Sequence, residues 1–450
     1  MVNTEVLVVG GGPAGVLSAL TAAKNGHSVI LVDAKSYTEI GNKTCGDAIN
    51  LGPLKLLDKE LGIQLPHGEE VAESVESLVF QTERVTFPLS GPGFVLNRHP
   101  YGQRLLKIAV ESGVEVRADT KAIRAIVDET GVKGAIVQEK GSKESYEIHA
   151  FITIDCSGRN YQIRKTIPTE LFPNLEKKME KRDVAASYRE IIRLKEDHPY
   201  DNKILLIYDS IIPEPGYFWI FSKGKKRLNI GIGWYLDMSV EKGMKELFRE
   251  VLHKYYPQGT YEVEDKGGYT IPTRYPLMNA VAPGFIAAGD SAFHVNPFSA
   301  EGHGPALSAG YYAGKISSEA LKVKDASEQQ LWGYNTAVMK DFGLSHTKLQ
   351  LFTEALRKVK TPGLEYLFKR NILTQDQFMA LHSGKGLGKS EIFKIILKGF
   401  PRYDLLLNLY KIAKGIQKFN RLFDRYPSTP QEFPDWENEF LLIMNNIRNW

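Results

Sequence analysis

The chain has 450 residues, and by length alone this suggests about three domains. Hydrophobic residues make up 43% and charged residues 24%, which is near the average for globular proteins, so a disordered chain, a collagen-like chain and a disulfide scaffold are excluded. The formal net charge of +4 is too small to indicate a nucleic-acid-binding protein.

The first segments predict two buried strands joined by a helix. Thr4–Gly10 is a short β-branched apolar run that ends in glycine, which is typical of a buried parallel strand. Pro13–Gly26 predicts a helix packed on a sheet, with proline tolerated in its first turn. Ser28–Asp33 predicts the second strand, and the three segments together form a right-handed βαβ unit.

The middle of the chain alternates between loops, strands and helices. Its predicted segments are, in order, loops and short pieces over Tyr37–Phe94, a helix over Tyr101–Ser112, a strand over Val114–Arg117, a hairpin over Ile123–Val137 and a strand over Tyr146–Asp155. Val184–Tyr235 has the period-two pattern of an antiparallel sheet. Phe285–Ala288 returns to a buried strand, and Gly304–Leu321 predicts a helix. The chain is helical and basic from about Ser327.

This order predicts an α/β fold with a Rossmann-like FAD-binding domain, an antiparallel-sheet substrate domain and a helical C-terminal region. We expect residues 1–165 with 270–325 to form the first domain, 166–269 the second and 326–450 the third. The two cysteines, Cys45 and Cys156, are typical of a reducing compartment, and no His/Cys pair has the spacing of a zinc site. Because we find neither a signal-peptide pattern nor an apolar run near the ~18 residues that span a bilayer, we expect a cytoplasmic protein.

The turn after the first strand carries the first chemical signal. Gly10, Gly12 and Gly15 form a G-x-G-x-x-G that follows a strand and opens a helix, with Ala14 between them. These glycines allow a tight turn, close approach of a pyrophosphate and close packing of helix on strand. Asp33 ends the second strand, where a carboxylate binds ribose hydroxyls and disfavours a 2′-phosphate. The motif therefore indicates FAD or NAD.

A second, distant segment favours FAD. Phe285–Asp290 is a strand that ends in an acid, and Ser299–Pro305 contains the start of a helix. Asp290 is placed to bind ribityl hydroxyls, and the amides at Gly302 and His303 would face the flavin N1/C2 edge, where charge accumulates on reduction. The structural alternative is a strand–turn–helix whose acid merely caps the helix.

With these segments, the chain resembles the p-hydroxybenzoate hydroxylase-like flavoproteins, and two further motifs resemble one branch of them, the geranylgeranyl reductases. Lys43–Ala48 is similar to the cysteine-glycine loop of that family, and Pro215–Ser222 is similar to its Y-x-W-x-F-P substrate motif. Order and spacing match over about residues 1–330. The resemblance implies that Cys45, Gly46 and Ala48 lie beside the flavin. By the same resemblance, Ala122 lies at the adenine.

The reaction that the resemblance implies is FAD-dependent reduction of isolated double bonds in geranylgeranyl chains during isoprenoid membrane-lipid biosynthesis. The substrate would be geranylgeranyl diphosphate, digeranylgeranylglycerophospholipid or both, with hydride from flavin N5. Tyr217, Trp219 and Phe221 share one face of a strand and would line the isoprenoid site, where aromatic rings stabilise a developing cation. The alternative reading of these three residues is core packing of a sheet.

Cys45, Tyr217 and Trp219 are the candidate catalytic residues. An ordinary thiol is mostly protonated at neutral pH, so Cys45 could donate the proton, but it could equally be a small residue that fits against the ring. The chain departs from the family pattern at Ser222, where proline is usual. Arg98 and Arg104 both fit the family's arginine that contacts the flavin, and the sequence does not choose between them.

The sequence leaves the partners and two competing functions open. The reductant could be NAD(P)H or a ferredoxin-like donor. The rivals are an aromatic monooxygenase or halogenase of the same superfamily and a non-enzymatic prenyl-binding escort, although the halogenase segment W-x-W-x-I-P is not found. Lys389–Arg425 holds nine basic and three acidic residues interleaved with apolar ones, which indicates either solvated helix faces or peripheral contact with an anionic membrane.

Overall fold

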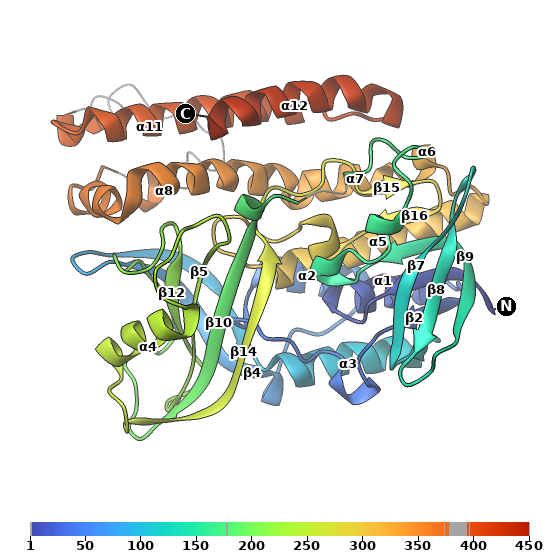
Figure 1. The fold of residues 1–450 in the computed structure, drawn as a ribbon, viewed down its shortest axis with the longest axis horizontal. Helices are drawn as coiled ribbons and strands as arrows, with labels where there is room; N and C mark the ends of the chain where they lie inside the picture. The colour runs from blue at the N-terminus through green and yellow to red at the C-terminus, as the bar shows by residue number, and fades with distance from the viewer. Residues whose placement is uncertain (1, 177–178, 373, 378–393, 396, 450) are drawn as a thin grey trace.

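A computed structural model describes residues 2–449 apart from 177–178, 373, 378–393 and 396. Two β-sheets stand side by side, and the last helices lie across them (Figure 1). The order in the first sheet is β15-β16-β9-β1-β2-β6, with β7 and β8 continuing from β9. The order in the second is β14-β10-β13-β12-β11-β4-β5-β3.

The first sheet contains the predicted βαβ unit. Its strands are β1 (Val2–Val9), β2 (Val29–Val32), β6 (Glu115–Arg117), β7 (Thr120–Asp128), β8 (Gly131–Glu139), β9 (Ser145–Asp155), β15 (Val281–Ala282) and β16 (Phe285–Ala287). Strand β1 pairs in parallel with β2 and β9, and β16 pairs in parallel with β9, so the strands that carry the two motifs are neighbours. Helix α1 (Pro13–Lys24) packs on this sheet, as predicted, with α5 (His303–Val323) against α1 and β9 and with α3 (Arg98–Glu111) against α1.

The second sheet is antiparallel except where β11 meets β4. Its strands are β3 (Ala48–Asn50), β4 (Val71–Gln81), β5 (Thr86–Leu96), β10 (Val184–Leu194), β11 (Lys203–Ile207), β12 (Tyr217–Ser222), β13 (Arg227–Tyr235) and β14 (Tyr261–Pro272). Helix α4 (Met244–Tyr255) covers one face, where Phe218 and Ile220 are buried. Tyr217, Trp219 and Phe221 occupy the other face, as the period of two predicts.

The segment that we expected to be loops, 37–94, is largely regular. It forms helix α2 (Leu51–Leu61) and the strands β4 and β5, which join the second sheet. Prolines and glycines within β5 hide the strand in the sequence. Because β3 pairs only with Gly93–Val95, most of β5 is an edge, where proline is tolerated. The division into domains stays a prediction, and residues 71–96 would have to be grouped with the second sheet.

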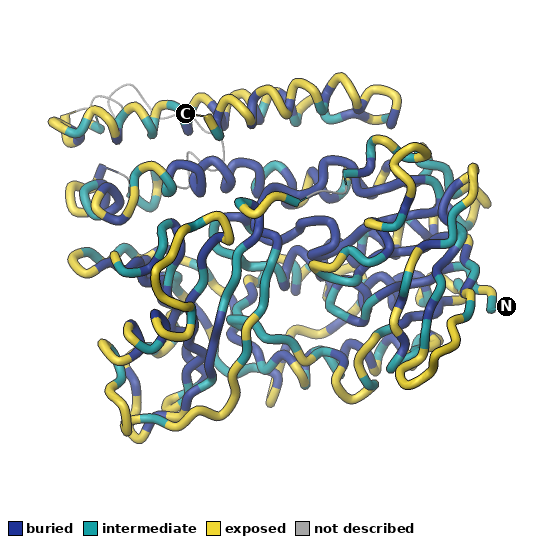
Figure 2. Tube along the Cα trace, viewed as in Figure 1, coloured by how far each residue is buried: buried dark blue, intermediate teal, exposed yellow. Residues whose placement is uncertain are grey.

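The C-terminal region is helical in the residues described, as expected. Its helices are α6 (Glu328–Leu331), α7 (Gly333–Val338), α8 (Leu344–Lys369), α11 (Tyr403–Phe423) and α12 (Phe433–Arg448). Helix α8 is mostly buried beneath α11 and α12, which expose their outer sides (Figure 2). The part of the predicted basic stretch that includes Lys389 and Glu391 lies outside the described residues.

Candidate active site

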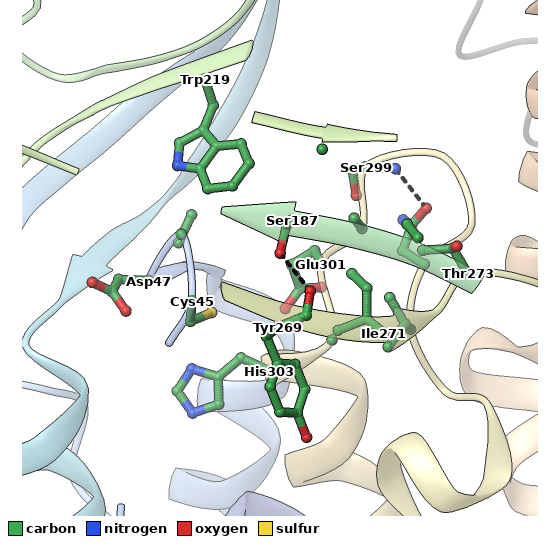
Figure 3. Close-up of a pocket in the computed structure, with 18 of the residues that line it drawn as sticks. Cys45, Asp47, Ser187, Trp219, Tyr269, Ile271, Thr273, Ser299, Glu301 and His303 are labelled. Atoms are coloured by element: carbon green, nitrogen blue, oxygen red, sulfur yellow. Dashed lines mark hydrogen bonds between the residues drawn. The ribbon is translucent and has the colours of Figure 1, made fainter. Parts of the chain in front are cut away.

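A cavity of about 380 Å³ is lined by strands of the second sheet, by residues that follow β9 and β16 of the first sheet, and by helices α1, α5 and α8. Figure 3 shows Trp219, Cys45 and Glu301 arranged around it. The predicted site residues that line it are Gly12, Ala14, Cys45, Gly46, Ala48, Arg98, Tyr217, Trp219, Phe221, Asp290, Gly302 and His303. Five others are absent from its lining: Gly10, Gly15, Asp33, Arg104 and Ala122.

The three glycines of the first motif have different structural roles. A Cβ at Gly10 would lie 2.4 Å from the Cys156 carbonyl oxygen, and one at Gly15 would lie 1.7 Å from the Gly10 carbonyl oxygen. These two glycines therefore allow β1, α1 and β9 to touch. A Cβ at Gly12 would meet no atom within 4 Å, and Gly12 lines the cavity. The Asp33 carboxylate accepts from the Gly11 amide at 2.6 Å, which ties the acid to the turn.

Two helix N-termini adjoin the cavity. Gly12 and Gly302 are the N-cap residues of α1 and α5, and neither has a side chain to accept a hydrogen bond from the first turn. Both residues line the cavity. Because the N-terminus of a helix carries positive partial charge, the two ends favour a phosphate or a developing anion there.

Lys43 and Asp290 form an ion pair within this lining. The Lys43 Nζ donates to Asp290 Oδ2 at 2.9 Å and lies 4.9 Å from the centre of the Tyr269 ring. Burial lowers the pKa of Lys43, but the Asp290 carboxylate, through its charge and its hydrogen bond, and the Tyr269 side chain together reverse this, so the net shift is upward. Lys43 therefore stays charged beside the acid predicted to bind ribityl hydroxyls.

The cysteine loop contacts two other predicted elements. Arg98, the first residue of α3, is buried and donates from Nη1 to the Cys45 sulfur at 3.3 Å. A Cβ at Gly46 would lie 2.7 Å from the Phe221 ring, so this glycine lets the loop pack directly on the aromatic strand. The motifs at 43–48 and 215–222 thus form one wall.

The choice between the two arginines is decided by position. Arg104 forms an ion pair with Glu70 at 2.5 Å and donates to the Gln64 carbonyl at 3.1 Å, away from the cavity lining. Of the two arginines, Arg98 lines the cavity and Arg104 does not, and the contact with the flavin stays a prediction. Ala122 is buried in β7.

A buried network holds the cysteine loop. Lys223 Nζ and Asn229 Nδ2 both donate to Asp47 at 3.0 Å, and Asn229 Nδ2 also donates to the Cys45 carbonyl at 2.7 Å. Trp219 Nε1 donates to Asn229 Oδ1 at 3.1 Å. Because these groups are buried and paired, they fix the loop and the indole relative to each other.

The aromatic wall is shaped by a glycine. Trp219 pairs across the sheet with Gly231, and a Cβ there would lie 2.1 Å from the indole ring. The indole can therefore lie flat along β13. At the start of the wall, the Tyr217 hydroxyl donates to the Ser299 carbonyl at 2.8 Å.

Burial favours the neutral forms of three titratable groups of the cavity. It raises the pKa of Tyr217, and it lowers the pKa of His303 well below its ordinary value, with Arg98 and Lys43 adding to the effect. Burial also raises the pKa of Glu301 to about 7, against hydrogen bonds from backbone amides that include that of Gly304. The cavity thus offers one carboxyl group that can hold a proton near neutral pH.

Sequence reasoning missed several lining residues. Lys43 and Glu301 lie inside the motifs described above but had no assigned role. Ser187 comes from β10, Tyr269 from β14, and Thr273 directly follows β14. Ser187 and Tyr269 are paired across these strands, and the Ser187 hydroxyl donates to the Tyr269 carbonyl at 3.1 Å (Figure 3). For these strand residues, the alternation of the two faces of a strand was the only sequence signal that they could line a site. In the described residues no cluster of three or more His, Cys, Asp or Glu could hold a metal ion.

Comparison with known sequences gives one family match and several relatives. A family model described as an FAD binding domain matches residues 3–336. The digeranylgeranylglycerophospholipid reductase of Sulfolobus acidocaldarius is 30% identical over 440 residues, which covers 97% of this chain and 96% of that protein. Digeranylgeranylglycerophospholipid reductase 2 of Methanopyrus kandleri is 29% identical over 423 residues, covering 92% and 99%.

Solved structures share the fold. A geranylgeranyl bacteriochlorophyll reductase-like protein from Thermoplasma acidophilum matches with a TM-score of 0.73 and 21% identity, covering 92% of this chain and 100% of that chain. A flavin-dependent brominase matches with a TM-score of 0.63 and 16% identity, covering 89% and 100%. At these identities the likeness concerns the fold alone.

Proposed function

We propose a function that rests on the family of this chain. The chain belongs to the FAD-binding-domain flavoproteins and, among them, to the geranylgeranyl reductases. Its cofactor is FAD. The chain is an FAD-dependent oxidoreductase that saturates isolated double bonds of geranylgeranyl chains, carried on a diphosphate or on a glycerophospholipid. The names of the relatives from Sulfolobus acidocaldarius and Methanopyrus kandleri support this substrate class.

The residues of the cavity fit FAD. Gly12 leaves open space at the start of α1, Asp33 is tied to the turn beside it, and Asp290 and the start of α5 line the same cavity. We assign the pyrophosphate to the α1 end, the ribose to Asp33 and the ribityl chain to Asp290. When bound and reduced, FAD supplies the hydride.

The protein side of the reaction must supply a proton, exclude water and stabilise positive charge on the alkene. The Cys45 thiol is our proton donor, and the Arg98 guanidinium at 3.3 Å would stabilise the thiolate that remains. Tyr217, Trp219 and Phe221 present π-faces to a cation-like carbon. The proton goes to the less substituted carbon and the hydride to the more substituted one, so one double bond gains one hydrogen pair.

One observation carries this proposal. A single cavity brings the Cys45 loop and the aromatic strand, which are far apart in the sequence, against the two helix ends that suit a dinucleotide. An aromatic monooxygenase or halogenase would share the fold, and the brominase likeness supports that alternative only weakly. The match to the FAD-binding model favours a flavoenzyme over a prenyl escort without flavin.

The test is a single-turnover reaction. The purified protein is loaded with FAD, reduced anaerobically with dithionite and mixed with geranylgeranyl diphosphate. We expect the flavin to reoxidise and the product to gain mass in steps of one hydrogen pair. Flavin that stays reduced, with unchanged substrate, would contradict the proposal for this substrate. A parallel sample with NADPH, oxygen, halide and a phenol detects the monooxygenase or halogenase reaction. The physiological donor, NAD(P)H or a ferredoxin-like protein, stays a prediction.

Helix α11 supports peripheral membrane contact as a finer part of the proposal. Tyr403, Leu407 and Tyr410 lie on one stripe and are each more than half exposed, and Lys414 continues that stripe. Exposed apolar side chains beside lysines are typical of helices that lie on anionic bilayers. Within the described residues, no helix is long and apolar enough to cross a bilayer. Co-sedimentation with anionic and neutral vesicles tests the contact, and equal binding to both would contradict it.

A further inference from the structure

A second cavity, of about 60 Å³, lies between the second sheet and helices α8 and α11. Its lining is Phe80, Phe87, Leu89, Tyr208, Phe298, Phe352, Ala355, Leu356, Val359, Leu364, Leu367, Phe368, Leu405, Asn408, Leu409 and Ile412. Among these side chains only Tyr208 and Asn408 carry a polar group. A cavity with such walls suits a hydrocarbon and offers almost nothing to a polar ligand.

The second cavity adjoins the first. Phe298 and Leu356 line both of them. Tyr208 in the second cavity and Tyr217 in the first have ring centroids 6.1 Å apart. At this point the two cavities are therefore separated by side chains and not by backbone.

The loop that carries Phe298 is anchored on both sides of that residue. The Tyr235 hydroxyl and the Thr353 hydroxyl both donate to the Pro297 carbonyl at 2.9 Å, and the Tyr217 hydroxyl donates to Ser299. The backbone at Phe298 is thus held to the second sheet and to α8, so the partition can open by rotation of its side chains while the loop stays in place.

A break in α8 shapes the outer wall. Lys360 has a φ of 57° inside the helix, and Pro362 follows it. The Thr361 amide, which cannot bond within a regular helix there, donates to Glu214 at 2.7 Å. The part of α8 after the break carries Phe368, which stacks on Phe87 with ring centroids 4.2 Å apart. The break therefore directs the second half of α8 onto the sheet and closes the cavity.

Most of these walls belong to a part of the chain that the proposed chemistry does not use. Helices α8 and α11 follow residue 336, where the match to the FAD-binding model ends. The inner stripe of α11, Leu405, Leu409 and Ile412, faces the cavity, while Tyr403 and Tyr410 face outward. These helices thus add an apolar compartment to a flavin-binding fold.

We propose that the second cavity binds the far end of the isoprenoid chain, the isoprene units remote from the polar head group, and that Phe298 and Leu356 form the constriction through which the chain passes. The inference rests on the proposed function. For one flavin to reach successive double bonds, the chain must advance, and each advance carries its end one unit deeper. The second cavity is the apolar space that receives that end.

The experiment fills the cavity from two different helices. Ala355→Phe acts from α8 and Leu409→Trp from α11, and Lys358→Trp, at an exposed position of α8, is the matched control. Each FAD-loaded, dithionite-reduced protein is given geranylgeranyl diphosphate or the shorter geranyl diphosphate, and fragment masses locate the hydrogen pairs. Bound flavin and the melting temperature of each variant report on its folding.

We expect both filling variants to lose saturation of the internal double bonds nearest the diphosphate of the long chain by at least about tenfold, because misplacing a reacting carbon by an ångström costs that much or more. Their rates with the short chain, and all rates of Lys358→Trp, should stay within about twofold of the original protein. Unchanged products from the long chain, or equal losses with both chains in a variant that retains flavin, would overturn the inference. An original protein that reduces neither substrate would instead overturn the proposed function. Because the two substitutions lie on different helices, the second variant still tests the inference if the first does not fold.

Discussion

On the side of the first sheet, the main cavity is walled by backbone and charge. Glycines stand at two helix ends, and Lys43 is paired with Asp290. On the side of the second sheet, the wall consists of aromatic rings. Their polar atoms form hydrogen bonds with the protein, as the Trp219 indole and the Tyr217 hydroxyl do. The first wall suits a cofactor with fixed polar groups, and the second suits a chain that has none. The Cys45 loop lies where the two walls meet, in contact with Arg98 and Phe221.

From this difference we expect that FAD binding and alkene reduction can be impaired separately. Changes in the first wall should act on the binding of FAD, and changes in the second should act on reduction while FAD stays bound. The following substitutions test that separation, beginning with the largest expected effect.

Gly15→Val should prevent the protein from folding, whereas Gly12→Ala should leave the fold intact and weaken the binding of FAD. A Cβ at Gly15 would lie 1.7 Å from a carbonyl oxygen, and no shift of a flexible side chain relieves that clash. A Cβ at Gly12 meets no protein atom but occupies the space where we place the pyrophosphate. We expect at least about tenfold weaker FAD binding for Gly12→Ala, measured by flavin fluorescence titration, with the flavin-free melting temperature nearly unchanged. Equal melting temperatures for both variants would contradict this assignment.

Cys45→Ala should lower the rate of alkene reduction by about a hundredfold or more while FAD remains bound, because a positioned acid contributes that much. Cys45→Ser is the matched control for size, since it keeps a small polar side chain with a far weaker acid. Stopped-flow flavin reoxidation with geranylgeranyl diphosphate measures the rate. If Cys45→Ala were as active as the original protein, the cysteine would only fill space against the ring, which is the alternative that the sequence left open.

Lys223→Met tests the junction of the two walls. Lys223 and Asp47 are buried at 2% and 5% side-chain exposure with 3.0 Å between Nζ and Oδ2, so removing the lysine leaves a buried carboxylate with a missing partner. We expect the free energy of unfolding to fall by about 3–5 kcal/mol. The double variant Lys223→Met/Asp47→Asn should recover part of that loss, because it removes the charge as well. Urea unfolding of the three proteins measures it, and additive losses would show that the pair is not coupled.

Parts of this site could be predicted from the sequence because their signals are local. The β1–α1–β2 unit follows from residues that are neighbours in the chain, and the spacing of Tyr217, Trp219 and Phe221 places them on one face of a strand. The resemblance to a family added the link between the cysteine loop and that strand, which spacing alone does not provide.

Other parts depend on contacts between distant segments. The sequence could not choose between Arg98 and Arg104, because the choice depends on how α3 is rotated against the fold. Strand β5 was hidden by its prolines, since only the shortness of its neighbour β3 makes them acceptable. Lys43 acquires its role only from Asp290, which lies 247 positions away.

Gly231→Ala should damage the second wall alone. The new methyl group would lie 2.1 Å from the Trp219 indole, so the ring must leave its place along β13 and lose its hydrogen bond to Asn229. We expect about a tenfold loss in the rate of alkene reduction, because the alkene loses its positioning surface, with FAD affinity unchanged within about twofold. Trp219→Phe is the companion variant, since it keeps a smaller ring without the clash. An equal loss of FAD affinity in Gly231→Ala would break the separation of the two walls.

The smallest expected effect concerns pH and belongs to the first wall. Burial raises the pKa of Glu301 to about 7 in the folded protein, above the ordinary value of about 4.3 that it has when unfolded. The folded state therefore holds this proton more tightly than the unfolded state. Its contribution to the free energy of unfolding is fully present below about pH 4.3, is lost as the pH rises toward about 7, and is constant above that. Glu301→Gln cannot ionise, so the flavin-free variant should lose less stability than the original protein between about pH 5 and pH 8. Urea unfolding at both pH values measures the difference, and parallel losses in the two proteins would mean that Glu301 does not titrate in this range.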